Sequence, residues 1–283
     1  MNYNQITVGI VTFKSSKVIF DCLNSIKKIK KIIIFDNSND KILKKKINLK
    51  FPNTKIYLSK KNLGYGVANN KIIKYATTPF VFILSPDVIL KKNCEENLLK
   101  TIKKLNQEFA IISPSAKIKN YGFFNQKLFS KSNILNVDYV NGYAMLINKT
   151  KIKNVGMFDK NIFLYYDEID LCKRLRLANH KIYVDKSSKV IHLGAKSSSI
   201  GFEFDKCRNW HYMWSKVYFE KKYSLNFLVN LKFIFFLFLQ IFKIIFYCIL
   251  FNKKEIIVKS MRFSGTFNAL IGRDSWYRPK FDV

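Results

Sequence analysis

Short apolar runs alternate with amphipathic stretches over the first half of the chain. The runs are short and rich in Ile, Val and Phe, which is typical of buried β-strands: TVGIVTF (7–13), KIIIFD (31–36), TKIYL (54–58), FVFILS (80–85) and FAIIS (109–113). Three segments with helical spacing lie between them, at 17–30, 66–76 and 93–106. Strands that alternate with helices predict an α/β fold with a doubly wound, mostly parallel sheet.

The pattern changes after residue 130. VDYVNGYAMLI (137–147) predicts a strand interrupted at Asn141-Gly142, and KIYV (181–184) with KVIHL (189–193) predicts a final strand pair that ends near His192. Between these lies NIFLYYDEIDLCKRL (161–175), which places three carboxylates within four positions. These residues could form only the acidic first turn of a helix, or they could take part in chemistry.

The segment 225–251 consists mainly of Phe, Leu and Ile and is long enough, as a helix, to span a bilayer. Lys232 and Lys243 lie inside it, and each would cost about 2.5–3.5 kcal/mol near mid-bilayer. Lysine recurs every eleven residues from 221 to 254, which predicts a basic stripe on one helix face. We favour a helix lying in the membrane interface over a spanning helix or a cytosolic helix packed on the domain before it. The expected organisation is a domain at 1–220 and a C-terminal helical appendage at 221–283.

The formal net charge of the chain is +31, which suits anionic partners such as nucleotide phosphates, nucleic acid or a membrane face. Recognisable nucleic-acid-binding motifs are missing from the sequence, so no nucleic acid is expected as a partner. The five cysteines form no C-x-x-C pair, which argues against a disulfide framework or a zinc site. The N-terminus does not read as a signal peptide, so we expect a cytoplasmic protein, peripheral on the inner face of the cell membrane.

Ligands of doubly wound sheets bind at the carboxyl ends of the strands, and three predicted strands end in polar residues. These ends are Thr12-Phe13, Asp36-Asn37 and Ser85-Pro86-Asp87, and a loop with Asn62 and Gly64 leads into a helix. Three of these four features have an ordinary structural alternative: an Asx turn at Asp36-Asn37, a Pro-Asp turn at Asp87 and a simple glycine turn at Gly64.

Seven motifs occur in one order along residues 5–220: VGIVTF, FDNSND, NLGYGVANN, SPDV, VNGYAMLI, GMFDKNIFLYYDEIDLCKRL and HLGAKSS. This series resembles the family 2 glycosyltransferases of the GT-A fold, particularly the rhamnosyltransferases of cell-surface polysaccharide assembly, lipopolysaccharide among them. The resemblance implies an inverting, metal-dependent hexosyl- or rhamnosyltransferase with a nucleotide-sugar donor (dTDP- or UDP-sugar), Mg²⁺ or Mn²⁺ as cofactor, and a glycan or lipid-linked acceptor. It implies a mixed, mostly parallel GT-A sheet, followed here by the membrane-associated helical segment.

The resemblance also assigns roles to residues. Asp87 would hold the cation, and His192 would be a second ligand unless it only forms a hydrogen bond at the strand end. The donor would meet six residues: Thr12, Phe13, Asp36, Asn37, Asn62 and Gly64. Glu168, in preference to Asp167, would be the base that deprotonates the acceptor hydroxyl. Independently of the resemblance, the i, i+4 spacing of Asp170 and Arg174 predicts a structural ion pair.

Two functions of other classes remain open. A catalytically silent nucleotide-sugar-binding protein of polysaccharide assembly is permitted because the usual Asp-x-Asp metal motif is shortened to Ser85-Pro86-Asp87. A nucleic-acid-binding protein that uses the basic surface is the more remote alternative.

Overall fold

The computed structural model describes residues 2–118, 132–194 and 201–279 of the chain. Contacts divide the chain into two compact units: Met1–Phe158 with Glu168–Ser199, and Asp159–Asp167 with Ile200–Val283. The helix α7 (Phe202–Tyr223) belongs to the second unit because it packs mainly against the helix α9 (Lys253–Leu270).

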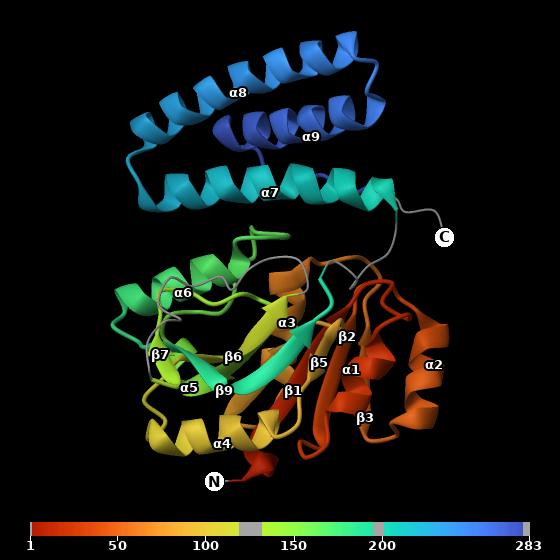
Figure 1. Ribbon diagram of the computed structural model, residues 1–283, viewed down its shortest axis with the longest axis vertical. Helices are drawn as coiled ribbons and strands as arrows, with labels where there is room; N and C mark the ends of the chain where they lie inside the picture. Colours follow the sequence, from red (N-terminus) through yellow and green to blue (C-terminus); the bar gives the residue numbers. More distant parts are fainter. Residues whose placement is uncertain (1, 119–131, 195–200, 280–283) are drawn as a thin grey trace. The chain divides into compact units, whose positions relative to one another are not determined.

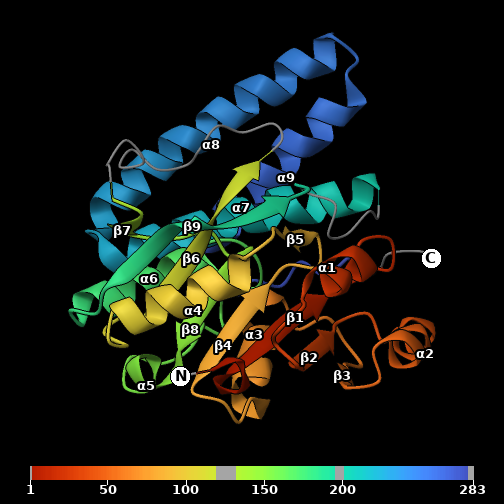
Figure 2. The same ribbon diagram turned by 60° about the horizontal axis from the view of Figure 1, so that its bottom comes forward.

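A mixed sheet forms the centre of the first unit (Figures 1 and 2). The described strands are β1 (Ile6–Thr12), β2 (Lys31–Asp36), β3 (Thr54–Leu58), β4 (Phe80–Leu84), β5 (Val88–Leu90), β6 (Ile111–Ile118), β7 (Ile134–Asn136), β8 (Ala144–Asn148) and β9 (Ile182–His192). Their order is β3-β2-β1-β4-β8-β6-β9-β5, with β7 beside β9. The four neighbouring strands β3, β2, β1 and β4 run parallel to one another. Strand β8 is antiparallel to β4 and β6, and β9 runs parallel to β6.

Helices cover both faces of this sheet. They are α1 (Ile19–Ser25), α2 (Lys41–Lys50), α3 (Tyr65–Tyr75), α4 (Cys94–Lys104), α5 (Lys149–Ile152) and α6 (Asp167–Leu177). Along β4, Phe80, Phe82 and Leu84 join one core with residues of α1, α2 and α4, whereas Val81 and Ile83 join another with residues of α3 and α6. Because successive side chains of a strand point to opposite faces, an uninterrupted apolar run is buried on both. The expected doubly wound α/β architecture is confirmed.

Two strand predictions differ from the structure. The expected pair at 181–184 and 189–193 is one strand, β9, and the polar residues between them lie at an irregularity in its pairing with β6. There, Ser187 and Ser188 donate hydrogen bonds to the buried carboxylate of Asp185. The expected strand at 137–147 begins only at Ala144, because residues 137–143 form turns and irregular backbone instead of pairing as a strand.

The described part of the second unit contains the helices α7, α8 (Asn226–Ile249) and α9. The helix α9 packs against both others, and Trp210, Trp214 and Phe233 belong to their common core. The residues after α9 fold back onto α7, where Ser275 Oγ lies 3.0 Å from His211 Nδ1 and the Tyr277 carbonyl lies 2.8 Å from His211 Nε2. Within the described chain, α8 alone is long and apolar enough to cross a membrane.

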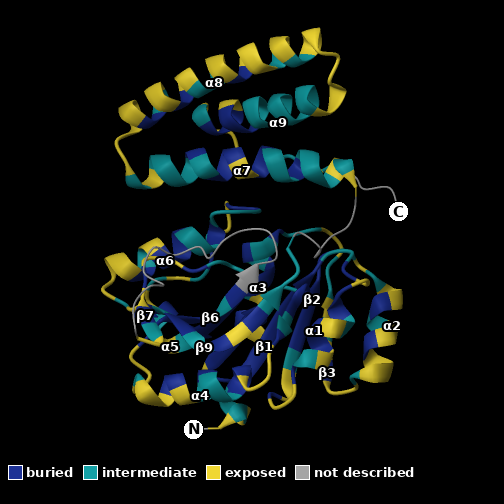
Figure 3. Cartoon of the chain, in the orientation of Figure 1, coloured by how far each residue is buried: buried dark blue, intermediate teal, exposed yellow. Residues whose placement is uncertain are grey.

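The prediction of one continuous basic stripe is wrong. Lys221 lies in α7, Lys254 lies in α9, and only Lys232 and Lys243 lie in α8, because the chain turns between the helices. Gln240, which lies between the two lysines of α8 in sequence, is buried on the face that carries Val229 and Phe233. The apolar segment itself is a helix, and most of its large apolar side chains are exposed (Figure 3).

Candidate active site

The ends of β1 and β2 bring together the predicted donor-binding residues Thr12, Phe13, Asp36 and Asn37. Thr12 Oγ1 donates a hydrogen bond to Asp36 Oδ1 at 2.8 Å, and the Asn37 amide donates to the Thr12 carbonyl. The buried Asp36 carboxylate also accepts from the Ser38 hydroxyl and from the backbone amides of Ser38 and Asp40. These are the contacts of the Asx-turn alternative, so the role of Asp36 towards a nucleotide stays a prediction.

Asn37 connects this strand end to the glycine loop. The side-chain nitrogen Nδ2 of Asn37 donates to the Gly64 carbonyl at 3.1 Å, and the side-chain oxygen Oδ1 accepts from the Leu63 backbone amide at 3.2 Å. Asn62 accepts from the Gly64 amide, and Gly64 has a φ of +82°, which favours glycine, immediately before α3 begins. The structure therefore gathers Asn62 and Gly64 beside Asn37, at a helix N-terminus whose dipole suits an anion.

Asp87 and His192 also lie together. Asp87 precedes β5, whose Val88 pairs with His192 at the end of β9, and the Leu193 amide donates to the Asp87 carbonyl. His192 Nε2 lies 3.5 Å from Asp87 Oδ2. His192 Nδ1 is buried without a hydrogen-bond partner in the described part of the chain, so this nitrogen has capacity for a ligand. The Gly-Ala-Lys-Ser-Ser stretch after His192 is residues 194–198, and all of it except Gly194 lies outside the described residues.

A line of contacts joins this pair to Glu168. The ring of Tyr143 stacks on the His192 ring with centroids 4.6 Å apart. The preceding residue, Gly142, accepts a hydrogen bond from the Tyr65 hydroxyl, and a Cβ built on Gly142 would lie 3.7 Å from the Cβ of Glu168. Tyr65 is the first residue of α3, directly after Gly64. The glycine loop, the Asp87–His192 pair and Glu168 thus converge on Gly142 and Tyr143 within the first unit.

The three carboxylates of the acidic segment differ in environment. Asp167 and Asp170 are buried, whereas Glu168 is partly exposed, so Glu168 is the one of the three residues that solvent reaches. Asp170 accepts from Arg174 Nε at 2.8 Å, which confirms the predicted pair. Two tyrosines with left-handed backbone, Tyr165 (φ +65°) and Tyr166 (φ +64°), precede α6, and such strain often accompanies functional sites.

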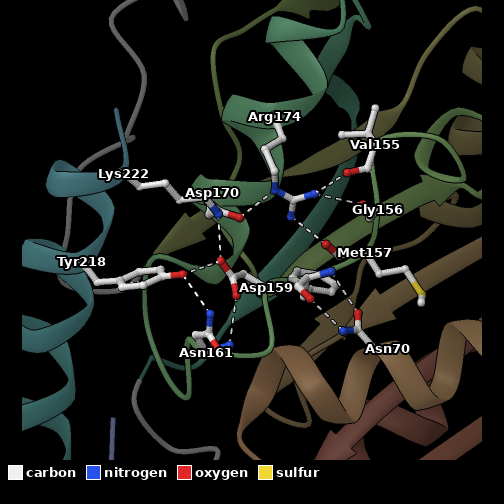
Figure 4. Close-up of polar contacts among 11 residues, drawn as sticks. Asn70, Val155, Gly156, Met157, Asp159, Asn161, Asp170, Arg174, Tyr218 and Lys222 are labelled. Atoms are coloured by element: carbon white, nitrogen blue, oxygen red, sulfur yellow. Dashed lines mark hydrogen bonds and ion pairs between the residues drawn. The ribbon is translucent and has the colours of Figure 1, made fainter. Parts of the chain in front are cut away.

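Arg174 clamps the loop before the acidic segment (Figure 4). Besides Asp170, its guanidinium donates to the carbonyls of Val155, Gly156 and Met157, at 2.9, 3.1 and 2.6 Å. The Asn70 side chain of α3 completes the clamp through two hydrogen bonds, one to the carbonyl and one from the amide of Phe158. The loop is therefore tied to both α6 and α3, the helices that carry Glu168 and Tyr65.

Sequence reasoning missed the residues at the centre of this arrangement. Gly142 was taken for an interruption of a strand, Tyr143 for part of that strand, and Tyr65 for part of the glycine loop that leads into a helix. The signal was present, because a glycine that interrupts an apolar strand often marks close approach of another group. The Gly142 contact with Glu168 is such an approach.

The sequence model of glycosyl transferase family 2 matches residues 7–176, and the chain belongs to this family. SunS, a prophage-derived glycosyltransferase of Bacillus subtilis, is 32% identical over 101 residues, which cover 35% of this chain and 24% of SunS. The rhamnosyltransferase WbbL of Escherichia coli is 25% identical over 240 residues, which cover 74% of this chain and 89% of WbbL.

A solved structure shares the fold at low sequence identity. The mannosyltransferase PcManGT of Pyrobaculum calidifontis, in complex with GDP-Man and Mn²⁺, has a TM-score of 0.56 and 10% identity, and the match covers 94% of this chain and 87% of PcManGT. The GT-A type fold expected from the sequence is therefore shown. Membership of the family supports a role in glycosyl transfer.

Proposed function

We propose that this protein is an inverting glycosyltransferase that moves a sugar from a nucleoside-diphosphate donor to a hydroxyl group of a glycan. Glu168 accepts the proton of that hydroxyl as its oxygen attacks the anomeric carbon, and the nucleoside diphosphate leaves from the opposite side. The observation that carries the proposal is the line of contacts from Asp87 through His192, Tyr143 and Gly142 to Glu168. It supports a base and a diphosphate site in the same part of the first unit.

The donor site would comprise the ends of β1 and β2 and the Asn62–Gly64 loop. Thr12, Phe13, Asp36 and Asn37 would border the nucleoside, and the amides at the start of α3 would favour its phosphates. The chain's large positive charge is consistent with an anionic donor. The GDP-Man bound to PcManGT supports the donor class, while dTDP- or UDP-sugars remain our choice for this chain.

Asp87 and His192 would hold a divalent cation beside the diphosphate. Across the described residues, no group of three His, Cys, Asp or Glu side chains could hold a metal by itself. Two protein ligands still fit a Mg²⁺ or Mn²⁺ ion that takes its other ligands from substrate phosphates and water. The cation would neutralise charge on the leaving diphosphate. The Mn²⁺ in PcManGT supports this choice of cofactor.

The acceptor would be a cell-surface glycan or a lipid-linked intermediate, and the sugar a hexose or rhamnose. The similarity to WbbL supports rhamnose and, with α8, a location on the cytoplasmic face of the cell membrane. One observation favours the alternative of a catalytically silent donor-binding protein, namely the small number of protein ligands at Asp87.

Donor binding tests the proposal. We expect one of the dTDP-, UDP- and GDP-sugars to raise the melting temperature of the wild type in the presence of Mn²⁺, and Asp87→Asn to abolish the metal-dependent part of that shift. Asp21→Asn, the same change at an exposed position of α1, is the matched control and should behave as wild type. The ligand-free melting temperature of each variant separates lost binding from lost folding. A wild type that binds no nucleotide sugar would rule the proposal out, and binding without any donor hydrolysis or transfer would favour the silent protein.

A further inference from the structure

The outer face of α8 is an extended apolar surface. Twelve of its large apolar side chains are exposed: Phe227, Leu228, Leu231, Ile234, Phe235, Phe238, Leu239, Ile241, Phe242, Ile245, Phe246 and Ile249. Figure 3 shows this face of α8 as almost continuously exposed. Half-exposed side chains of this size present on the order of 1,000 Å² together, whereas the largest apolar patch of a typical soluble monomer is about 300–600 Å². Such a surface requires an apolar partner.

The charges around this surface indicate what the partner is. Lys232 and Lys243 are exposed on α8 itself, and Lys253 and Lys254 are exposed at the turn into α9, next to the exposed Phe251. An apolar helix face bordered by lysines matches a bilayer whose headgroups are anionic. A second copy of this chain, with its own charge of +31, would bring like charges together around the same face.

The opposite face of α8 decides how the helix lies in the bilayer. This face packs against α9, where Lys259 Nζ lies 5.6 Å from the centre of the Tyr247 ring and 2.7 Å from Glu255 Oε2. Towards the start of α8, Lys232 Nζ lies 2.5 Å from Glu220 Oε2 of α7. A spanning α8 would carry these ion pairs and the charged helix α9 into the hydrocarbon, where charged groups are costly. A helix in the membrane plane leaves them on the aqueous side.

We infer that α8 lies in the plane of an anionic membrane leaflet, with its outer face in the acyl layer and α9 and α7 on the water side. The helix is then an interfacial anchor and does not cross the bilayer. This inference deepens the proposed function by naming the membrane surface at which the protein would meet a lipid-linked acceptor. It rests on the proposed function only in taking the acceptor to be at a membrane. It concerns the second unit alone.

A depth measurement distinguishes the two orientations. Phe227, Phe238 and Ile249 are spaced by eleven residues, so they lie on one face of α8, with exposed fractions of 75%, 57% and 69%. Cys248 is the exposed cysteine of the chain and the other four are buried, so Cys248→Ser gives a background for single thiol labels. Each position is changed to cysteine in the full chain, labelled with an environment-sensitive fluorophore, and quenched by lipids with shallow or deep spin labels in vesicles of phosphatidylglycerol and phosphatidylcholine.

An in-plane helix predicts the same depth for all three labels. Three outcomes would overturn the inference: a deep label only at 238, which indicates a spanning helix; no change of any label on adding vesicles; or labels shielded without lipid in a protein that sediments as a dimer. Donor binding by the same labelled proteins in solution is a separate readout, so failure of the membrane inference and failure of the proposed sugar transfer are told apart.

A charge-matched pair of variants tests the anionic partner. Lys253→Glu/Lys254→Glu changes the charge beside the apolar face, and Glu is well tolerated in the first turn of a helix. We expect a loss of vesicle binding of roughly 30-fold, since each basic residue near an anionic surface adds about fivefold. Lys45→Glu/Lys46→Glu, on exposed positions of α2, makes the same charge change and should cost less than threefold. Equal losses in the two variants would show that binding follows net charge rather than this face.

Discussion

Replacing Arg174 with Met removes the cation of a buried ion pair and the donors of the clamp. Asp170 is completely buried, and the Arg174 side chain is 19% exposed, so this pair is screened far less than a surface pair. Breaking a buried pair from one side costs about 3–5 kcal/mol. The carbonyls of Val155, Gly156 and Met157 also lose their charged donor. We therefore expect Arg174→Met to lower the free energy of unfolding by about 3–5 kcal/mol.

Arg176→Met is the matched control on the same helix. Arg176 pairs with Asp138, and both side chains are exposed, so the loss of that pair should cost at most about 1 kcal/mol. Urea unfolding followed by far-UV circular dichroism measures both variants. Tryptophan fluorescence is the wrong probe, because all three tryptophans (210, 214 and 276) lie in the second unit. A cost for Arg174→Met below 1 kcal/mol, or no greater than that of Arg176→Met, would refute the reasoning.

Further predictions concern the second unit, which tryptophan fluorescence does report. In Gly265→Ala the new Cβ would lie 2.3 Å from the backbone carbonyl oxygen of Trp210, so α9 must move away from α7. We expect the free energy of unfolding, measured with urea, to fall by about 1–3 kcal/mol. An unchanged urea midpoint would contradict this contact. Burial lowers the pKa of His211 to about 3, so below pH 6.5 the unfolded chain binds a proton that the folded protein does not. The contribution of His211 to the free energy of unfolding should therefore be complete above pH 6.5 and decrease towards pH 3, with a loss of about 2 kcal/mol at pH 5. His211→Gln should remove this pH dependence.

Strands buried on both faces could be predicted from the sequence because their apolar runs are continuous. The bounds of β2 and β3 agree with the predicted segments 31–36 and 54–58. The helix α2 was missed since it exposes a lysine-rich surface and buries only Leu43 and Ile47. The polar residues in the middle of β9 were taken for a gap between two strands. In the structure, these residues donate hydrogen bonds to the buried carboxylate of Asp185.

The site was predicted in part for a similar reason. Polar residues at strand ends gather by topology alone, so Thr12, Asp36 and Asn37 could be placed together from the strand pattern. The ring stacking of Tyr143 on His192 depends on a turn before β8 that the apolar pattern conceals. The eleven-residue lysine repeat misled because a period in the sequence has meaning only within one helix, and this one crosses two helix breaks.

The most direct test of the account compares sugar transfer by Glu168→Gln and Asp167→Asn with donor affinity measured on the same proteins. Glu168 is partly exposed beside Gly142, and Asp167 is buried. If Glu168 is the base, Glu168→Gln loses about 10²–10⁴-fold in transfer rate while its donor affinity stays within about threefold of wild type. Glu168→Gln transferring sugar at the wild-type rate, or losing donor affinity in parallel with rate, would contradict the central claim.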